Sequence, residues 1–284
     1  MSVSDLRRTL VEQAARVCAE FGPLRLAAAV LGAPIPDPAR EAEFGILALE
    51  DGAAGLYYAW LGGAQAELPQ RFHAADFAGV DVMDVARLYL AGADAERSLG
   101  LAAISAVTAH FYRRAGYRPP SAPDSMAGLD VGPGDRLGFI GNFVPLVRYA
   151  RARGVDVAVV ERKAHMVHAE PGLVISLDPR VLHDRSHVIC TGTTLLNDSF
   201  EAMLPHCPHA RRLVLVGPTV GFFPDAVFAR GVDAVAGTAI VDTAQALARV
   251  AAGAAIGDTG RRTLIARDHY PGFDTLLERA LARG

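Results

Sequence analysis

The sequence predicts an α/β protein in which a small α+β region precedes a region built on a parallel sheet. After residue 135, short apolar runs alternate with helical segments, which is typical of a sheet buried on both faces. Before residue 118, amphipathic helices accompany a hairpin pattern. We therefore expect a first domain at residues 1–118, a linker at 119–134 and a Rossmann-like second domain at 135–284.

The first region opens with a predicted amphipathic helix that has Ser4 as its N-cap and Gly22 just past its end. Asp51-Gly52 lies between two strand-like runs and readily forms a tight hairpin turn. A later helix is apolar on most of its surface, so we expect it to be buried between layers. The expected strands are 24–31, 44–49 and 55–61, and the expected helices are 81–91 and 94–115.

Three prolines between Arg118 and Pro123 bar helix formation and ladder pairing, so this stretch is interpreted as the linker. The helix expected at 144–153 tolerates a proline in its first turn. Another is expected to start at Asp198, with Glu201 as its capping-box partner. The strands expected in the second region are 137–140, 155–160, 188–190, 213–216 and 234–236, with 263–266 as a sixth.

Composition excludes several classes of function. The chain is 51% hydrophobic and 21% charged. Its formal net charge is −3 and it has no run of basic residues, so we expect no basic surface that binds nucleic acid. The N-terminal stretch carries acids in its first turns, unlike a signal or transit peptide, and no apolar run is long enough to span a bilayer. Three cysteines far apart suggest reduced thiols. We expect a cytoplasmic protein.

A parallel α/β sheet binds its ligand outside the carboxyl ends of the strands. Glu161 ends the second strand, twenty residues after Gly141, where nucleotide- and S-adenosylmethionine-binding folds place an acid for ribose hydroxyls. The competing interpretation is a solvated Glu161 paired with Arg162. The strand-end loops are 141–143, 161–168, 191–197, 217–223 and 237–242.

The loop at 191–197 concentrates hydroxyls and backbone N–H groups at an expected helix N-terminus, which would attract phosphate or carboxylate. Plain N-capping is the competing interpretation. The candidate cofactor-binding residues are Gly141, Asn142, Glu161, Thr191, Thr193, Thr194 and Asn197.

Metal ligation requires histidine, cysteine or carboxylate side chains that converge in space. His165 and His168 lie on the expected rim with Glu170 nearby, and Cys190 ends the adjacent strand. These three, His165, His168 and Cys190, are the candidate ligands of a divalent transition metal. Two histidines in a polar loop are more often merely solvated. No nucleophile elbow, P-loop, zincin motif or Cys-x-x-Cys pair occurs.

Several segments together resemble the DUF364 family, known as the heavy-metal chelation domain. They are Gly141-Asn-Phe-Val-Pro, Val-Val-Glu161-Arg, Thr191-Gly-Thr-Thr-Leu-Leu-Asn197, Val-Gly-Pro218 and Arg-Gly231-Val…Ala-Gly237. The segment Glu96-Arg-Ser-Leu-Gly-Leu-Ala-Ala-Ile-Ser is similar to the end of its usual partner, the DUF4213 domain. The resemblance implies an enolase-N-terminal-like domain followed by a Rossmann-like domain, in a homodimer. The family pattern Asn-Gly-Thr is replaced here by Asn197-Asp198-Ser199.

The leading hypothesis is a small-ligand protein that binds a metal or metal chelate in the crevice at these strand ends. The alternative is an enzyme that binds S-adenosylmethionine or a nucleotide in the same crevice. In that case Glu161 would contact the ribose, and Lys163 or His165 would carry a proton. A third hypothesis is a dimeric interaction module with a vestigial crevice.

Overall fold

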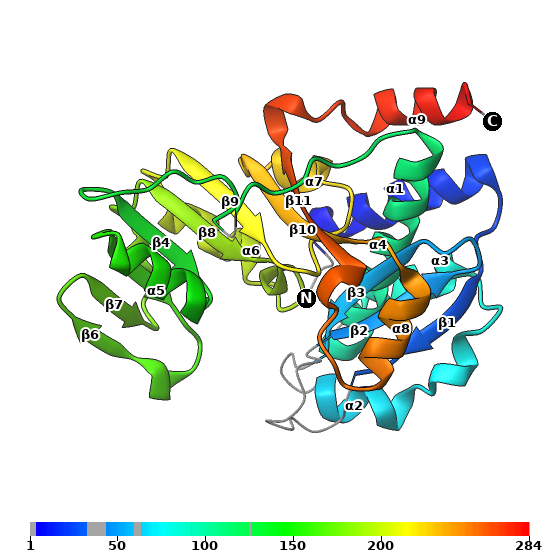
Figure 1. Cartoon of the computed structure of the whole chain (residues 1–284), viewed down its shortest axis with the longest axis horizontal. Coiled ribbons are helices and arrows are strands. Elements are labelled where there is room, and N and C mark those ends of the chain that lie inside the picture. The colour runs from blue at the N-terminus through cyan, green and yellow to red at the C-terminus, as the bar shows by residue number, and fades with distance from the viewer. Residues whose placement is uncertain (1–3, 33–43, 60–63, 92, 125, 284) are drawn as a thin grey trace.

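The computed structural model describes residues 4–32, 44–59, 64–91, 93–124 and 126–283. These residues form two sheets (Figure 1). The small antiparallel sheet has the order β1-β2-β3, and the strands of the large sheet extend away from it, with β6 at the far end. The small sheet consists of β1 (Leu26–Val30), β2 (Phe44–Leu49) and β3 (Ala54–Tyr58). This confirms the predicted mixed α/β class.

The elements of the first region follow from local signals. Ser4 accepts a hydrogen bond from the backbone N–H of Arg7 and caps α1 (Asp5–Phe21), which ends at Gly22 with a φ of 89°. Gly52, with a φ of 82°, lies in the turn between β2 and β3, as expected. Residues 60 and 61, predicted as the end of a strand, lie outside the described residues.

Helix α4 (Asp94–Arg114) is buried on nearly all sides because it lies between the small sheet and the rest of the chain. On one side, a Cβ added to Gly55 of β3 would lie 2.0 Å from the Ala102 carbonyl oxygen, so strand and helix backbones are in close contact. On the other side, Phe111 stacks on Phe273 at a centroid distance of 5.1 Å. The other helices of this region are α2 (Ala64–Arg71) and α3 (Val82–Ala86).

The described large sheet has the order β11-β10-β9-β8-β4-β5-β7-β6. Strands β4, β5, β7, β8, β9 and β10 are parallel, and their order along the sheet is 3-2-1-4-5-6 in chain numbering, the order of doubly wound sheets. The expected strands are therefore confirmed. They are β4 (Arg136–Ile140), β5 (Asp156–Val160), β8 (His187–Thr191), β9 (Arg212–Val216), β10 (Ala234–Ile240) and β11 (Gly260–Ala266).

Two expectations for this region are wrong. The long connection through His168 contains a hairpin, β6 (His168–Glu170) and β7 (Leu173–Ser176), and β7 adds a parallel strand beside β5. Asp198 does not begin a helix: it has a φ of +60°, and α6 (Phe200–Met203) starts after Ser199 without a side-chain cap. The Asp198 carboxylate bonds two arginines instead.

The linker is not free of ladder pairing, contrary to the prediction from its prolines. The N–H of Leu264 donates to the Pro120 carbonyl at 2.9 Å, and the N–H of Ala122 donates to the Arg262 carbonyl at 3.1 Å. In this pairing Pro120 acts only as an acceptor through its carbonyl, so the N–H group that proline lacks is not required. The linker therefore runs along the outer edge of β11.

Helix α8 (Thr243–Ala251) leaves the large sheet and covers the face of the small sheet opposite α4 (Figure 1). Ala246 and Val250 pack there against Ile46 and Leu56. No helix of the described chain is long and apolar enough to cross a membrane. The remaining helices are α5 (Val144–Ala152), α7 (Asp225–Phe228) and α9 (Phe273–Leu281).

Candidate functional site

A cavity of about 530 Å³ lies where the small sheet and α4 meet the β9 and β10 end of the large sheet. The β2–β3 turn, the end of α4, the linker, the loop after β9 and the β10–β11 hairpin all contribute to it. Two of the five expected strand-end loops, 217–223 and 237–242, therefore border the cavity. The close approach of these loops requires Gly237, where an added Cβ would lie 1.7 Å from the Val220 carbonyl oxygen.

Among the described residues, the charged side chains that line this cavity are three arginines, Arg113, Arg118 and Arg261, and none of the lining residues is a histidine, a cysteine or a carboxylate. Arg113 is neutralised, because its guanidinium lies 2.7 Å from the Asp51 carboxylate. Arg118 is exposed and has no ion-pair partner within the described residues. The cavity therefore combines positive charge with apolar surface.

Arg261 is held by the linker. Its Nη1 donates to the Ser121 hydroxyl at 2.9 Å and its Nη2 to the Pro119 carbonyl at 3.0 Å. Its Nε is buried and has no hydrogen-bond partner in the described chain. Burial, and then the nearby charge of Arg118, lower the pKa of Arg261. Arg118 and Arg261 are thus two neighbouring cations that have no carboxylate partner among the described residues.

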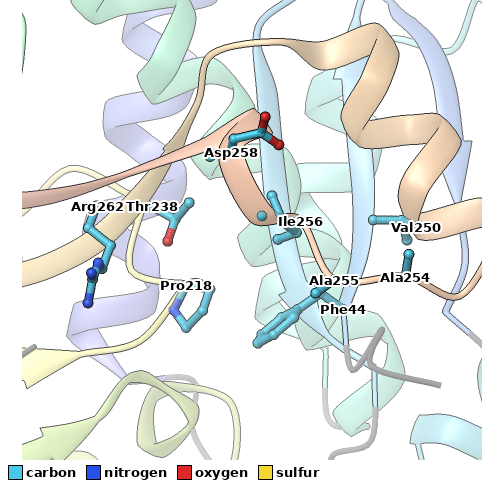
Figure 2. A pocket seen from close by; sticks show the side chains of 11 residues that line it. Phe44, Pro218, Thr238, Val250, Ala254, Ala255, Ile256, Asp258 and Arg262 are labelled. Carbon is cyan, nitrogen blue, oxygen red and sulfur yellow. The ribbon is translucent and has the colours of Figure 1, made fainter. Parts of the chain in front are cut away.

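A second cavity, of about 490 Å³, lies on the other side of the β10–β11 hairpin. Figure 2 shows Phe44, Pro218 and Ile256 around it, with Arg262 on β11 and Asp258 above. Pro218 and Thr238 border both cavities. Consecutive strand residues point to opposite faces, which explains why Arg261 lines the first cavity and its neighbour lines the second.

The predicted metal ligands do not form a closed centre. In the described residues no three histidine, cysteine or carboxylate side chains lie close enough to hold a metal ion. His165 is exposed, and His168 is exposed on the edge strand β6, 3.4 Å from the Glu170 carboxylate. Cys190 instead is buried in the core, where burial raises the pKa of its thiol to about 12. The thiolate that a metal requires is therefore disfavoured there.

The hydroxyls of the Thr191 loop are used within the loop. Thr194 donates to the Thr191 carbonyl at 2.6 Å, and Thr191 accepts from the backbone N–H of Thr193. Only a four-residue 3₁₀ helix follows, Gly192–Leu195. The Leu195 carbonyl accepts from the buried Tyr89 hydroxyl at 3.1 Å. This loop thus caps itself and packs against the first region, as the N-capping interpretation expects.

The other cofactor candidates lie along the same edge of the sheet. Gly141 has a φ of +92°, and an added Cβ would lie 2.8 Å from Thr191, so the loops after β4 and β8 are adjacent. Glu161 accepts from the N–H groups of Arg162 at 2.7 Å and Lys163 at 3.2 Å, which turns its carboxylate toward its own loop. Asn142 is half-buried beside Gly141, and the Asn197 side chain accepts from the Ser199 hydroxyl at 2.6 Å.

Sequence reasoning missed the two arginines of the cavity. In the sequence, Arg118 only borders the predicted linker, and Arg261 precedes the strand expected at 263–266, so neither residue carries a sign of a ligand. The strand-end rule could have located the cavity, because it selects the loop after β10 and that loop borders the cavity. The distance in sequence between Arg118 and Arg261 hides their proximity.

Comparison with known proteins agrees with this architecture. A protein of unknown function from Pyrococcus horikoshii aligns with a TM-score of 0.67 and 18% identity over 92% of this chain and 99% of that one. One from Desulfitobacterium hafniense aligns with a TM-score of 0.65 and 18% identity, with the same coverage. Both are described as members of the DUF364 family. At this identity the likeness shows the fold alone.

The fold defines an α/β protein whose doubly wound sheet is joined to a small antiparallel sheet. The chain belongs to the DUF364 family, described as "Putative heavy-metal chelation", whose model matches residues 124–266. An uncharacterized protein of Methanocaldococcus jannaschii is 30% identical over 153 residues, which are 54% of this chain. The chain spans 58% of the length of that relative. The assignment of residues 1–118 to DUF4213 stays a prediction.

Proposed function

We propose that this protein binds a heavy metal as a chelate in the cavity between the small sheet and the end of the large sheet. The description of its family supports the metal. The observation that carries the proposal is the cavity of about 530 Å³, a size in the range of small-molecule sites, to which both regions contribute.

The form in which the metal binds follows from the lining. Tight binding of a bare transition metal needs several nitrogen, sulfur or carboxylate donors in the correct geometry. The lining residues that the structure describes offer hydroxyls and arginines but none of these donors. A small organic ligand must therefore supply them, and the protein binds the complex by its shape, apolar surface and charge.

Calorimetric titration of the metal-stripped protein tests this function. The titrants are Zn²⁺, Ni²⁺ and Co²⁺ as free ions, and the same ions as citrate and nitrilotriacetate complexes. We expect saturable binding of at least one complex and no stoichiometric binding of the free ion. Saturable binding of the free ion alone, or of no titrant, would contradict the proposal.

A variant that fills the cavity locates the site. Ala109 lines the cavity from α4 and is half-buried, so Ala109→Phe places a ring in the cavity. The same substitution at the exposed Ala19 of α1 is the matched control. Binding of the complex should be lost in Ala109→Phe and retained in Ala19→Phe, and equal binding by the two variants would move the site elsewhere.

A second candidate is an enzyme that binds a nucleotide or S-adenosylmethionine between the loops after β4 and β8. The strand order favours it, because ligands of doubly wound sheets lie where the order reverses, which is between these two strands. Glu161 would have to leave its own loop amides to reach a ribose. Thermal-shift measurement with both ligands tests this candidate: a shift lost in Glu161→Ala supports it, and no shift counts against it.

A further inference from the structure

We propose that Arg118 and Arg261 form an oxyanion subsite that binds a carboxylate or phosphate group of the cavity ligand. This inference takes from the proposed function only that the cavity is the ligand site. The ligand class is a small molecule with an apolar body and one oxyanion end. A guanidinium matches such a group, since its parallel N–H donors bind two oxygens at once.

The first argument is charge. In the part of the chain that the structure describes, no carboxylate lines the cavity, and of its three arginines only Arg113 has an ion-pair partner, Asp51. Arg118 and Arg261 line the same cavity, and Arg261 donates to the carbonyl of Pro119, the residue that follows Arg118, so the two charges are neighbours. Two like charges held together at a cavity wall repel each other, and a bound anion removes that repulsion. Charge therefore favours an anion beside these two residues.

The second argument is preorganisation. Arg261 is fixed by Ser121 and Pro119, so its guanidinium loses little conformational entropy when a ligand binds. Each of its Nη atoms carries two N–H groups, and the bonds to Ser121 and Pro119 use one of each, so a second N–H on each Nη is left for a ligand oxygen. Arg118 is exposed and can approach from the linker.

The third argument concerns the rest of the ligand. Away from the arginines the wall is largely apolar, with Leu56, Val220 and Ile265 among its residues. A ligand held only by charge would leave this surface in contact with water, so an apolar body adds affinity. A cationic ligand such as S-adenosylmethionine is disfavoured, because its sulfonium would be repelled at the arginine side.

The test uses anions without metal: inorganic phosphate, citrate and phenyl phosphate, each titrated at constant ionic strength. Arg118→Gln is the principal variant, because Arg118 is exposed and its loss leaves folding intact. Arg162→Gln, which removes the same charge from an exposed loop after β5, is the matched control. Arg118→Lys keeps the charge and removes the fork.

We expect saturable anion binding, with phenyl phosphate tighter than phosphate. In Arg118→Gln the dissociation constant should rise at least tenfold, as for the loss of a charged hydrogen-bond pair, and in Arg162→Gln it should stay within twofold. The dissociation constant of Arg118→Lys should lie between those of Arg118→Gln and Arg162→Gln. Absence of saturable binding by all three anions, or equal affinity in Arg118→Gln and Arg162→Gln, would overturn the subsite.

The outcomes also separate this inference from the proposed function. Anion binding that depends on Arg118, without binding of any metal complex, keeps the subsite and rejects the metal chelate. Binding of a metal complex that is unchanged in Arg118→Gln keeps the chelate and rejects the subsite.

Discussion

The carboxylate of Asp198 accepts a hydrogen bond from the buried guanidinium of Arg7, which joins the loop after β8 to the first helix across 191 residues of sequence. Arg97 of α4 donates to the other carboxylate oxygen at 3.3 Å. Asp198 has a φ of +60°, in the left-handed region that favours glycine. The aspartate therefore occupies a backbone conformation that suits glycine and contributes an ionic contact between the two regions.

Replacement of Asp198 should separate the effect of the lost ion pair from the effect of the positive φ. Asp198→Ala leaves Arg7, whose side chain is only 6% exposed, without its carboxylate. We expect a loss of about 3 kcal/mol in the free energy of unfolding, the low end for a broken buried pair because Asp198 is partly exposed. Asp198→Gly should lose about 1 kcal/mol less, because glycine tolerates the positive φ. Urea unfolding measures both, and equal losses would contradict the backbone argument.

Gly237→Ala should disrupt the border of the cavity. The new methyl group would meet the Val220 carbonyl oxygen, and backbone atoms cannot yield as a flexible side chain does. Overpacking of this kind costs about 1–3 kcal/mol. Gly132→Ala is the control, since an added Cβ there meets no atom within 4 Å. Thermal unfolding should show a lower midpoint for Gly237→Ala only, and similar midpoints for the two variants would refute the close approach.

Acid should remove the stabilisation that ionised Asp51 contributes to the fold. Burial raises its pKa, but hydrogen bonds from His110 and the Ala53 N–H, with the charge of Arg113, outweigh burial and lower the pKa from 3.8 to about 2. A lowered pKa stabilises the fold above pH 3.8, and this stabilisation disappears as the pH falls toward 2.

The difference in urea midpoint between wild type and Asp51→Asn should therefore be largest at pH 6 and shrink by pH 2.5. Asp130→Asn, at an exposed position, is the control and should show no such trend. A difference for Asp51→Asn that stays constant with pH would contradict the lowered pKa of Asp51.

The cysteines should differ in reactivity. Burial raises the pKa of Cys190 to about 12 and the pKa values of Cys18 and Cys207 to about 11. Iodoacetamide reacts with thiolates, so Cys190, the most buried of the three, should be modified last in the native protein. Mass spectrometry of timed samples measures this, with urea-unfolded protein as the control in which all three react. Early labelling of Cys190 would contradict its burial.

The double variant His165→Ala, His168→Ala tests the metal site predicted from the sequence. Both rings are exposed, and no third ligand is grouped with them in the described chain. We expect it to bind a metal complex with the affinity of the wild type in the same calorimetric titration. Loss of metal binding would restore these histidines as ligands and reject the chelate in the cavity.

Most of the fold was predictable because the large sheet is built from short apolar runs bounded by glycine, charge or proline. The β6–β7 hairpin was missed because its first strand, His168–Glu170, is exposed and carries no apolar alternation. The predicted capping box at Asp198 is wrong, because the Asp198 carboxylate forms ion pairs with Arg7 and Arg97, which are distant in sequence. Local propensity predicts local elements, and tertiary ion pairs override it.

The site was less predictable for a related reason. The strand-end rule selected loops that border the cavity, but residue chemistry directed attention to histidine and cysteine. Cys190 points into the core and His168 lies on an edge strand, a difference that depends on side-chain direction and topology. Arg118 and Arg261 meet only because the linker runs along β11.

Helix α8 determines when, during synthesis, the apolar face of the small sheet becomes covered. It covers one face of the small sheet, where Ala246 and Val250 pack on Ile46 and Leu56. During synthesis the strands at residues 44–58 leave the ribosome almost two hundred residues before the helix that shields them. Their apolar face stays open until then and is a surface for chaperones or for aggregation. Residues 1–118 expressed alone would keep that face exposed permanently.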